Sequence, residues 1–177
     1  MRKKSLVLLM CSVALLSMLL TPTLIADARR FHHHGRKPAS GTWVFYPDHK
    51  HMKFEEGYTF ILGNETGEWT GTFEGTDEAV FFAEKNPAGT IVYLPYGVIF
   101  FEGKVNGKTG TLRINFGPAV KKGDPMLWSG PWEILSGTGE LENLRGQGTW
   151  WETEPTHIIY EGWIRFKDYQ NNDYNDD

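Results

Sequence analysis

Two glutamates, Glu102 and Glu140, are the residues whose type and surroundings best suit proton-transfer chemistry. Each stands beside an apolar run of the sequence. Burial in an apolar interior disfavours the charged form of a carboxyl group, which suits it to donate or accept a proton near neutral pH. Carboxylates at exposed strand ends are much commoner. We therefore expect both side chains to be solvated, and we assign no catalytic residue.

Histidines near the amino end are the candidate metal ligands. His32, His33 and His34 are consecutive, and Asp48, His49 and His51 follow in a second cluster. Such clusters can bind Zn²⁺, Cu²⁺ or Ni²⁺, but neither spacing matches a closed structural site. We interpret both as solvated segments and predict no metal and no cofactor. A metal- or mineral-binding role for the histidine triplet together with the acidic tail is a third hypothesis for function.

Six aromatic side chains are candidates for lining an apolar cavity. They are Trp43, Trp69, Tyr93, Trp128, Trp132 and Trp150, with Glu102 and Glu140 as the polar candidates of the same interior. Small closed barrels either fill with side chains or leave room for one small ligand. We favour a filled core, because a domain without disulfides depends on aromatic burial for its stability.

The amino terminus has the order of features of a secretory signal peptide. Basic residues at positions 2–4 precede the uncharged run Leu6–Leu20, and the small residues Ala26 and Ala28 follow Pro22. We predict a signal peptide over residues 1–28 and a secreted protein. The alternative is an uncleaved anchor, since the apolar stretch is about long enough to span a bilayer.

Charge and cysteine content exclude several partners. The chain has 18 Lys and Arg against 22 Asp and Glu; without residues 1–28 it keeps 15 and 21, a net charge of −6. An acidic domain repels the phosphate groups of nucleic acids, so we predict no nucleic-acid partner. The one cysteine, Cys11, lies in the leader, so the mature chain has no disulfide. The sequence also lacks the Gly-x-Ser-x-Gly, phosphate-loop and His-Glu-x-x-His motifs.

Short β-branched and aromatic runs, separated by Gly, Asn, Asp or Pro, fill the chain between residues 41 and 167. Residues 29–40 are basic and read as a flexible lead-in, and residues 168–177 as a disordered acidic tail. The predicted strands are Gly41–Tyr46, Tyr58–Leu62, Glu68–Glu74, Ala79–Ala83, Thr90–Leu94, Gly97–Val105, Lys108–Phe116, Trp128–Ser136, Gly146–Trp151 and Ile158–Phe166. Many short strands indicate one all-β barrel or sandwich.

The sequence Asn106-Gly107 predicts a hairpin, because both residues tolerate the positive φ angles of a type I′ turn. In the strand that follows, Leu112, Ile114 and Phe116 alternate with polar residues, which predicts one buried face. Repeated one-sided alternation fits closure around a single interior, although a two-sheet sandwich gives the same pattern.

Two segments carry a family pattern: FEGKVNGKTGTL at 101–112 and SGTGELENLRGQG at 136–148. They resemble an uncharacterised family grouped with the allene oxide cyclase-like β-barrels, a calycin-like fold. The resemblance implies a single closed antiparallel barrel of about eight strands. Small residues at 136–139 suit a tight corner, Leu141 and Leu144 are expected to plug one end, and Gly146 and Gly148 to permit sharp coiling.

The leading hypothesis is therefore a secreted, non-enzymatic barrel that binds a small hydrophobic molecule or acts in surface interactions. The alternative, implied by the resemblance, is an isomerase or cyclase acting on a hydrophobic substrate. An enzyme requires inward-facing polar groups inside a real cavity, whereas a structural barrel needs neither. Both the non-enzymatic barrel and the enzyme could associate into a homo-oligomer. Contact with a membrane is expected only if the leader is uncleaved.

Overall fold

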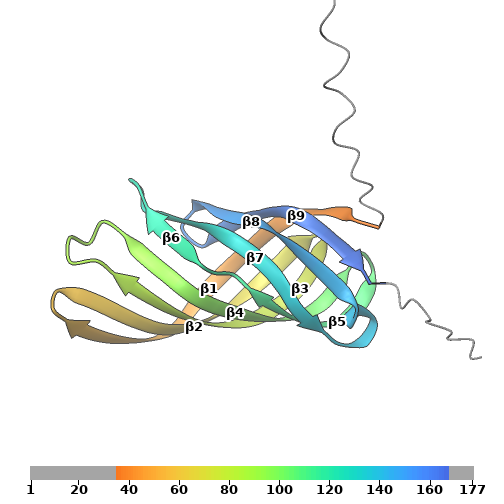
Figure 1. The fold of residues 1–177 in the computed structure, drawn as a ribbon, viewed down its shortest axis with the longest axis horizontal. Coiled ribbons are helices and arrows are strands. Elements are labelled where there is room, and N and C mark those ends of the chain that lie inside the picture. The colour runs from red at the N-terminus through yellow and green to blue at the C-terminus, as the bar shows by residue number, and fades with distance from the viewer. Residues whose placement is uncertain (1–34, 168–177) are drawn as a thin grey trace, which may run out of the picture. The chain divides into compact units, whose positions relative to one another are not determined.

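A computed structural model describes residues 35–167, which form an all-β domain (Figure 1). The elements in chain order are β1 (Lys37–Glu55), β2 (Tyr58–Gly71), β3 (Phe73–Lys85), β4 (Val92–Val105), β5 (Lys108–Asn115), β6 (Ala119–Lys122), β7 (Leu127–Gly137), the 3-10 helix η1 (Gly139–Leu141), β8 (Leu144–Glu154) and β9 (His157–Phe166). Within this part of the chain, no helix is long and apolar enough to cross a membrane. The predicted signal peptide, the histidine triplet and the acidic tail lie outside the described residues.

Eight strands close into an antiparallel barrel. They pair in the order β1–β2–β3–β4–β5–β7–β8–β9, and β9 pairs back with β1. The short β6 pairs with both β4 and β7. Each of the eight strands has a partner on both sides for part of its length, although residues 47–55 of β1 pair with β2 alone. The predicted closed barrel of about eight strands is confirmed.

The two ends of the barrel differ. At the open end, on the left of Figure 1, the β1–β2 hairpin and the β3–β4 connection project, and β6 lies beside them. At the opposite, closed end lie the β4–β5 turn and η1. The difference matters for function, because the closed end is plugged by side chains and the open end is not.

Strand β1 is much longer than the predicted Gly41–Tyr46. Residues 37–40, which the sequence assigned to a flexible lead-in, pair with β9, so that boundary is wrong. Beyond Tyr46, a bulge between Pro47 and Lys50 lets β1 continue beside β2 to the hairpin tip. Alternation does not reveal the first extension, whose side chains are small or polar, and the apolar residues of the second, Met52 and Phe54, are exposed. Backbone pairing forms each extension, residues 37–40 with β9 and residues 50–55 with β2.

Several other predicted strands merge or lengthen: Ala79–Ala83 lies within β3, and Thr90–Leu94 and Gly97–Val105 belong to one strand, β4. Tyr58–Leu62 and the first part of Glu68–Glu74 belong to one strand, β2, and the chain turns at Gly71, where φ is 99°. The sequence does not predict β6, because four residues are too few to show alternation.

The predicted hairpin at Asn106-Gly107 is confirmed. The φ angles of the two residues are 51° and 80°, as a type I′ turn requires, and Val105 pairs with Lys108 across the two-residue loop. The predicted inward face of the next strand is also confirmed: Leu112, Ile114 and Phe116 are all buried.

Aromatic rings fill the barrel from its middle to the closed end. Trp43 and Trp69 stack with their ring centroids 5.1 Å apart. Phe73 packs edge-on against Phe101 and Trp132, at 5.9 and 5.7 Å. Burying such side chains stabilises the fold by roughly 1.5–3 kcal/mol each, and edge-on geometry suits the quadrupoles of the rings. The filled core predicted from the sequence describes this half of the barrel.

The closed end is held by two leucines and a tyrosine. Leu141 and Leu144 are fully buried, as expected for plugs. The Tyr160 hydroxyl donates to the Thr70 carbonyl and accepts from the Phe73 amide, at 3.0 Å in each case. Burial raises the pKa of Tyr160 to about 12, so its hydroxyl stays a donor and ties β9 to β2 and β3 throughout the ordinary pH range.

Candidate ligand-binding site

The half of the barrel towards the open end contains a cavity of about 330 Å³, here called the open-end cavity. Its lining is mostly apolar, and the residues nearest the filled half are aromatic. Trp43 separates the halves, since it stacks on Trp69 and also lines the cavity. Phe116 lies 5.9 Å from Trp43 and 6.2 Å from Trp150, centroid to centroid. The expectation of a completely filled barrel is therefore wrong for this half.

The six aromatic candidates divide into three groups. Trp43, Trp128 and Trp150 line the open-end cavity. Trp69 and Trp132 are buried in the filled half. Tyr93 is 37 % exposed and points outward, because its neighbours Val92 and Leu94 occupy the inward positions of β4. The prediction that Tyr93 faces the interior is wrong.

The two predicted carboxylates, Glu102 and Glu140, both lie outside the barrel interior, so their place among the interior candidates is wrong. Glu102 follows the buried Phe101, and strand alternation turns it to solvent. Glu140 is exposed in η1, where its Oε2 accepts a hydrogen bond of 2.9 Å from the Thr109 amide. Both side chains are therefore solvated, as we expected from the sequence.

Three lysines and two glutamates supply the charged part of the cavity lining: Lys50, Lys85, Lys121, Glu65 and Glu152. The two glutamates are almost completely buried, at 6 % and 4 % exposed. They differ in one respect that decides their roles. Glu152 is engaged by protein groups, whereas Glu65 is not.

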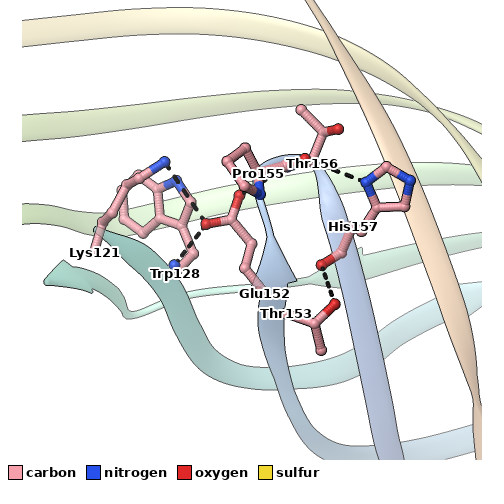
Figure 2. A network of polar contacts seen from close by, with 7 residues as sticks. All are labelled: Lys121, Trp128, Glu152, Thr153, Pro155, Thr156 and His157. Carbon is pink, nitrogen blue, oxygen red and sulfur yellow. Dashed lines mark hydrogen bonds and ion pairs between the residues drawn. The ribbon is translucent and has the colours of Figure 1, made fainter. Parts of the chain in front are cut away.

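Glu152 is held on both carboxylate oxygens (Figure 2). Its Oε2 accepts from the Trp128 amide at 2.7 Å and lies 3.7 Å from Lys121 Nζ. Its Oε1 accepts from the amide of Thr156, 3.2 Å away, a residue with a positive φ of 71°. One carboxylate thus connects β8 to β6, to β7 and to the turn between β8 and β9. We assign Glu152 a structural role at the open end.

Replacing Glu152 with alanine should lower the free energy of unfolding by about 3 kcal/mol, because two amides lose a charged acceptor and Lys121 loses its partner. Urea denaturation measures the change. The exposed Glu154, two residues away, gives the matched control: Glu154→Ala should change stability by less than about 0.5 kcal/mol. Equal losses in the two variants would contradict the structural role.

Glu65 faces the open-end cavity from β2 without a protein partner. Among the groups that the structure describes, which do not include the His49 side chain, none hydrogen-bonds to the Glu65 side chain or pairs with it as an ion. Burial raises its pKa to about 8; the Asp77 and Glu152 carboxylates raise it as well, and Lys50 opposes them. At neutral pH the side chain is therefore mainly a neutral carboxylic acid, with a proton to donate into the cavity.

Asp77 is the third buried carboxyl group of the interior, at 5 % exposed. Its Oδ1 accepts from the indole N–H groups of Trp43 and Trp69, at 3.0 and 2.7 Å. Its Oδ2 has no hydrogen-bond partner in the described part of the chain. Burial raises the pKa of Asp77 to about 6, against the opposing effect of the two indole bonds. Asp77 fixes both rings and so shapes one wall of the cavity.

Glu65, Asp77 and Glu152 were not singled out from the sequence, yet strand parity could have found them. Glu65 lies four residues before Trp69, and Glu152 two after Trp150, so each shares the inward face of a tryptophan. The signal in β2 is hidden because Gly63 and Gly67 occupy its other inward positions. When alternation is judged by hydropathy alone, polar residues on the inward face are predicted to be exposed.

The part of the chain that the structure describes contains no candidate metal site. No group of three or more His, Cys, Asp or Glu side chains there is arranged to hold a metal ion. His32–His34 and the side chain of His49 lie outside the described residues, so the predicted absence of metal binding at those positions stays a prediction.

Comparison with known proteins supports the fold and leaves the function open. No protein-family model matches the chain, and no curated protein matches it either. Among solved structures, the chain is similar to a protein of unknown function from the DUF3224 family of Shewanella oneidensis MR-1, with a TM-score of 0.61 and 14 % identity. The match covers 75 % of this chain and 98 % of that one. At this identity the likeness shows a shared fold and nothing about function. The chain therefore belongs, by its fold, to the class of closed antiparallel β-barrels.

Proposed function

We propose that this protein binds one small, mainly apolar molecule inside the barrel, entering at the open end. The open-end cavity carries the proposal. Its volume of about 330 Å³ lies at the lower end of the range of small-molecule sites, which are typically apolar with a few placed polar groups. Aromatic side chains bound it on the side of the filled half, and charged side chains supply the few polar groups.

The energetics of the fold also support a ligand. Without a disulfide in residues 35–167, the domain depends on burial, and a cavity forfeits contacts that a larger side chain would make. Ala83 illustrates this, since it is fully buried and lines the cavity with a single methyl group. A small side chain at such a position leaves room that a bound molecule fills.

Filling the cavity should weaken ligand binding. Titration with the neutral fluorescent probe N-phenyl-1-naphthylamine should show one site per chain. Ala83→Phe should weaken that binding at least about tenfold, because the added ring occupies the cavity. Val80→Phe is the matched control, since Val80 lies on the same strand, β3, with its side chain exposed outside the barrel.

Urea denaturation of both variants establishes that they fold. A wild-type chain that does not bind the probe, or a folded Ala83→Phe variant that binds it as the wild type does, would overturn the proposal.

An isomerase or cyclase of the allene oxide cyclase-like type is the second candidate function. One specific observation favours it: a neutral carboxylic acid, Glu65, and a charge-paired carboxylate, Glu152, line the same cavity. Two carboxyl groups held in different environments of one cavity are a common arrangement for acid–base work. Glu152 is already occupied by two amides and Lys121, and for that reason we place binding first.

We also propose that binding takes place outside the cytoplasm, following export by the leader predicted at residues 1–28. The acidic net charge of the chain, −4 in full, is consistent with a partner other than nucleic acid. Mass analysis of the protein exported by its own host would test cleavage, since a retained leader would instead indicate a membrane anchor.

A further inference from the structure

We infer that the ligand is an uncharged, mainly apolar carbonyl compound whose oxygen accepts a hydrogen bond from Glu65. This inference rests on the proposed function and adds the chemical class of the ligand. It is carried by geometry: a carboxyl group on the wall of the open-end cavity that is 94 % buried (6 % exposed) and has no protein partner.

The contrast with the other buried carboxyl groups identifies Glu65 as the group for the ligand. Asp77 accepts from two indoles. Glu152 accepts from two amides and pairs with Lys121. Buried polar groups are nearly always satisfied, and leaving one unpaired is destabilising. A hydrocarbon filling the cavity leaves Glu65 unpaired, whereas a ligand with a suitable polar atom completes it.

The proton on Glu65 selects an acceptor. Its pKa of about 8 keeps the group protonated at neutral pH, so it offers an O–H donor to the ligand. A carbonyl oxygen beside an apolar body matches this donor and the aromatic lining around it. An ether or hydroxyl oxygen is a weaker match, because its two lone pairs are less exposed between its two substituents than those of a terminal carbonyl oxygen.

Desolvation disfavours a cationic ligand. The charges that act on Glu65 are the carboxylates of Asp77 and Glu152 and the ammonium group of Lys50, so the lining charges alone do not exclude a cation. An ammonium group beside Glu65 would, however, have to lose its hydration, and Glu65 would have to give up its proton to pair with it. An amine should therefore bind less well than a neutral carbonyl compound.

Three probes with one naphthalene skeleton test the inference: 2-ethylnaphthalene, 2-acetylnaphthalene and 1-(2-naphthyl)ethylamine. Each competes with N-phenyl-1-naphthylamine for the full chain at pH 7. The ketone should bind about tenfold more tightly than the hydrocarbon, since it alone satisfies Glu65. The amine should bind more weakly than the ketone.

Variants at Glu65 and a second pH assign the preference to this group. Glu65→Leu should bind ketone and hydrocarbon equally. Glu65→Gln keeps a donor that does not titrate, so its preference for the ketone should be equal at pH 7 and pH 10. In the wild type that preference should disappear at pH 10, where Glu65 has lost its proton. Asp77 titrates near pH 6, below this window. Lys50, Lys85, Lys121 and Glu152, which face Glu65 across the cavity, are common to both proteins.

The outcomes separate the inference from the proposed function. If the ketone and the hydrocarbon bind equally tightly to the wild type at pH 7, the carbonyl assignment is wrong while cavity binding stands. If the amine binds most tightly, the ligand class is cationic and the assignment is again wrong. If neither these probes nor N-phenyl-1-naphthylamine binds, both the proposed function and the inference fail.

Discussion

At pH 9 the Glu65→Gln variant should be more stable than the wild type by up to about 5 kcal/mol, whereas at pH 5 the two should differ little. The pKa of Glu65 is about 8 in the fold and 4.5 ordinarily. Each pKa unit corresponds to about 1.4 kcal/mol. Between pH 4.5 and pH 8 the folded protein holds a proton that the unfolded chain releases. Stability therefore falls as pH rises through this window. Glutamine has no proton to lose and escapes the penalty.

Urea denaturation of ligand-free protein at both pH values measures the effect. Asp77 makes the wild type lose stability in the same direction, between pH 3.8 and about 6. Both proteins share that contribution, so the difference between them isolates Glu65. Glu102→Gln is the matched control, because Glu102 is exposed on the outside of β4 and the change should be neutral at both pH values. A gain for Glu65→Gln that is the same at pH 5 and pH 9 would show that burial does not disfavour its charge.

Gly148→Ala should destabilise the fold by more than about 3 kcal/mol, the upper range for overpacking a rigid core. A Cβ at position 148 would overlap the Glu161 carbonyl oxygen and lie 2.6 Å from Trp132 Nε1. Both neighbours are fixed, because Trp132 Nε1 donates to that same carbonyl at 3.1 Å. Opposite Gly148 in the strand pairing lies another glycine, Gly162, and the indole fills the space where two side chains would otherwise stand.

Thermal and urea unfolding measure this loss. Gly107→Ala gives a matched control, since position 107 has no atom within 4 Å of an added Cβ. Its cost comes only from its positive φ of 80° and should be roughly 1 kcal/mol. If the two substitutions cost the same, close packing of Trp132 is not what requires glycine at position 148.

This result would also explain the motif at residues 136–148. Leu141 and Leu144 are fully buried, and Gly148 gives room to Trp132. The motif thus specifies how the closed end is packed and says nothing about ligand chemistry. A resemblance based on such residues predicts a barrel well and a function poorly, because function depends on which side chains line the opposite half.

The amino-acid sequence by itself determined that the domain is all-β, together with the parts that depend on local chemistry. Asn106-Gly107 predicts its turn because few residue pairs accept two positive φ angles. Leu112, Ile114 and Phe116 reveal their buried face through a period of two. Leu141 and Leu144 were expected as plugs and are buried. Each of these features depends on residues close together in the chain.

Only the tertiary structure decided where the cavity lies and which polar groups face it. Glu65 and Glu152 are 87 residues apart in sequence, yet both line the open-end cavity. Whether the interior is filled depends on the sum of side chains contributed by eight strands, and no single strand contains that information. In the sequence, Glu102 and Glu65 cannot be distinguished, because each is a charged residue within a strand. Closure of the barrel turns one towards solvent and buries the other, and burial is what changes its pKa and its chemistry.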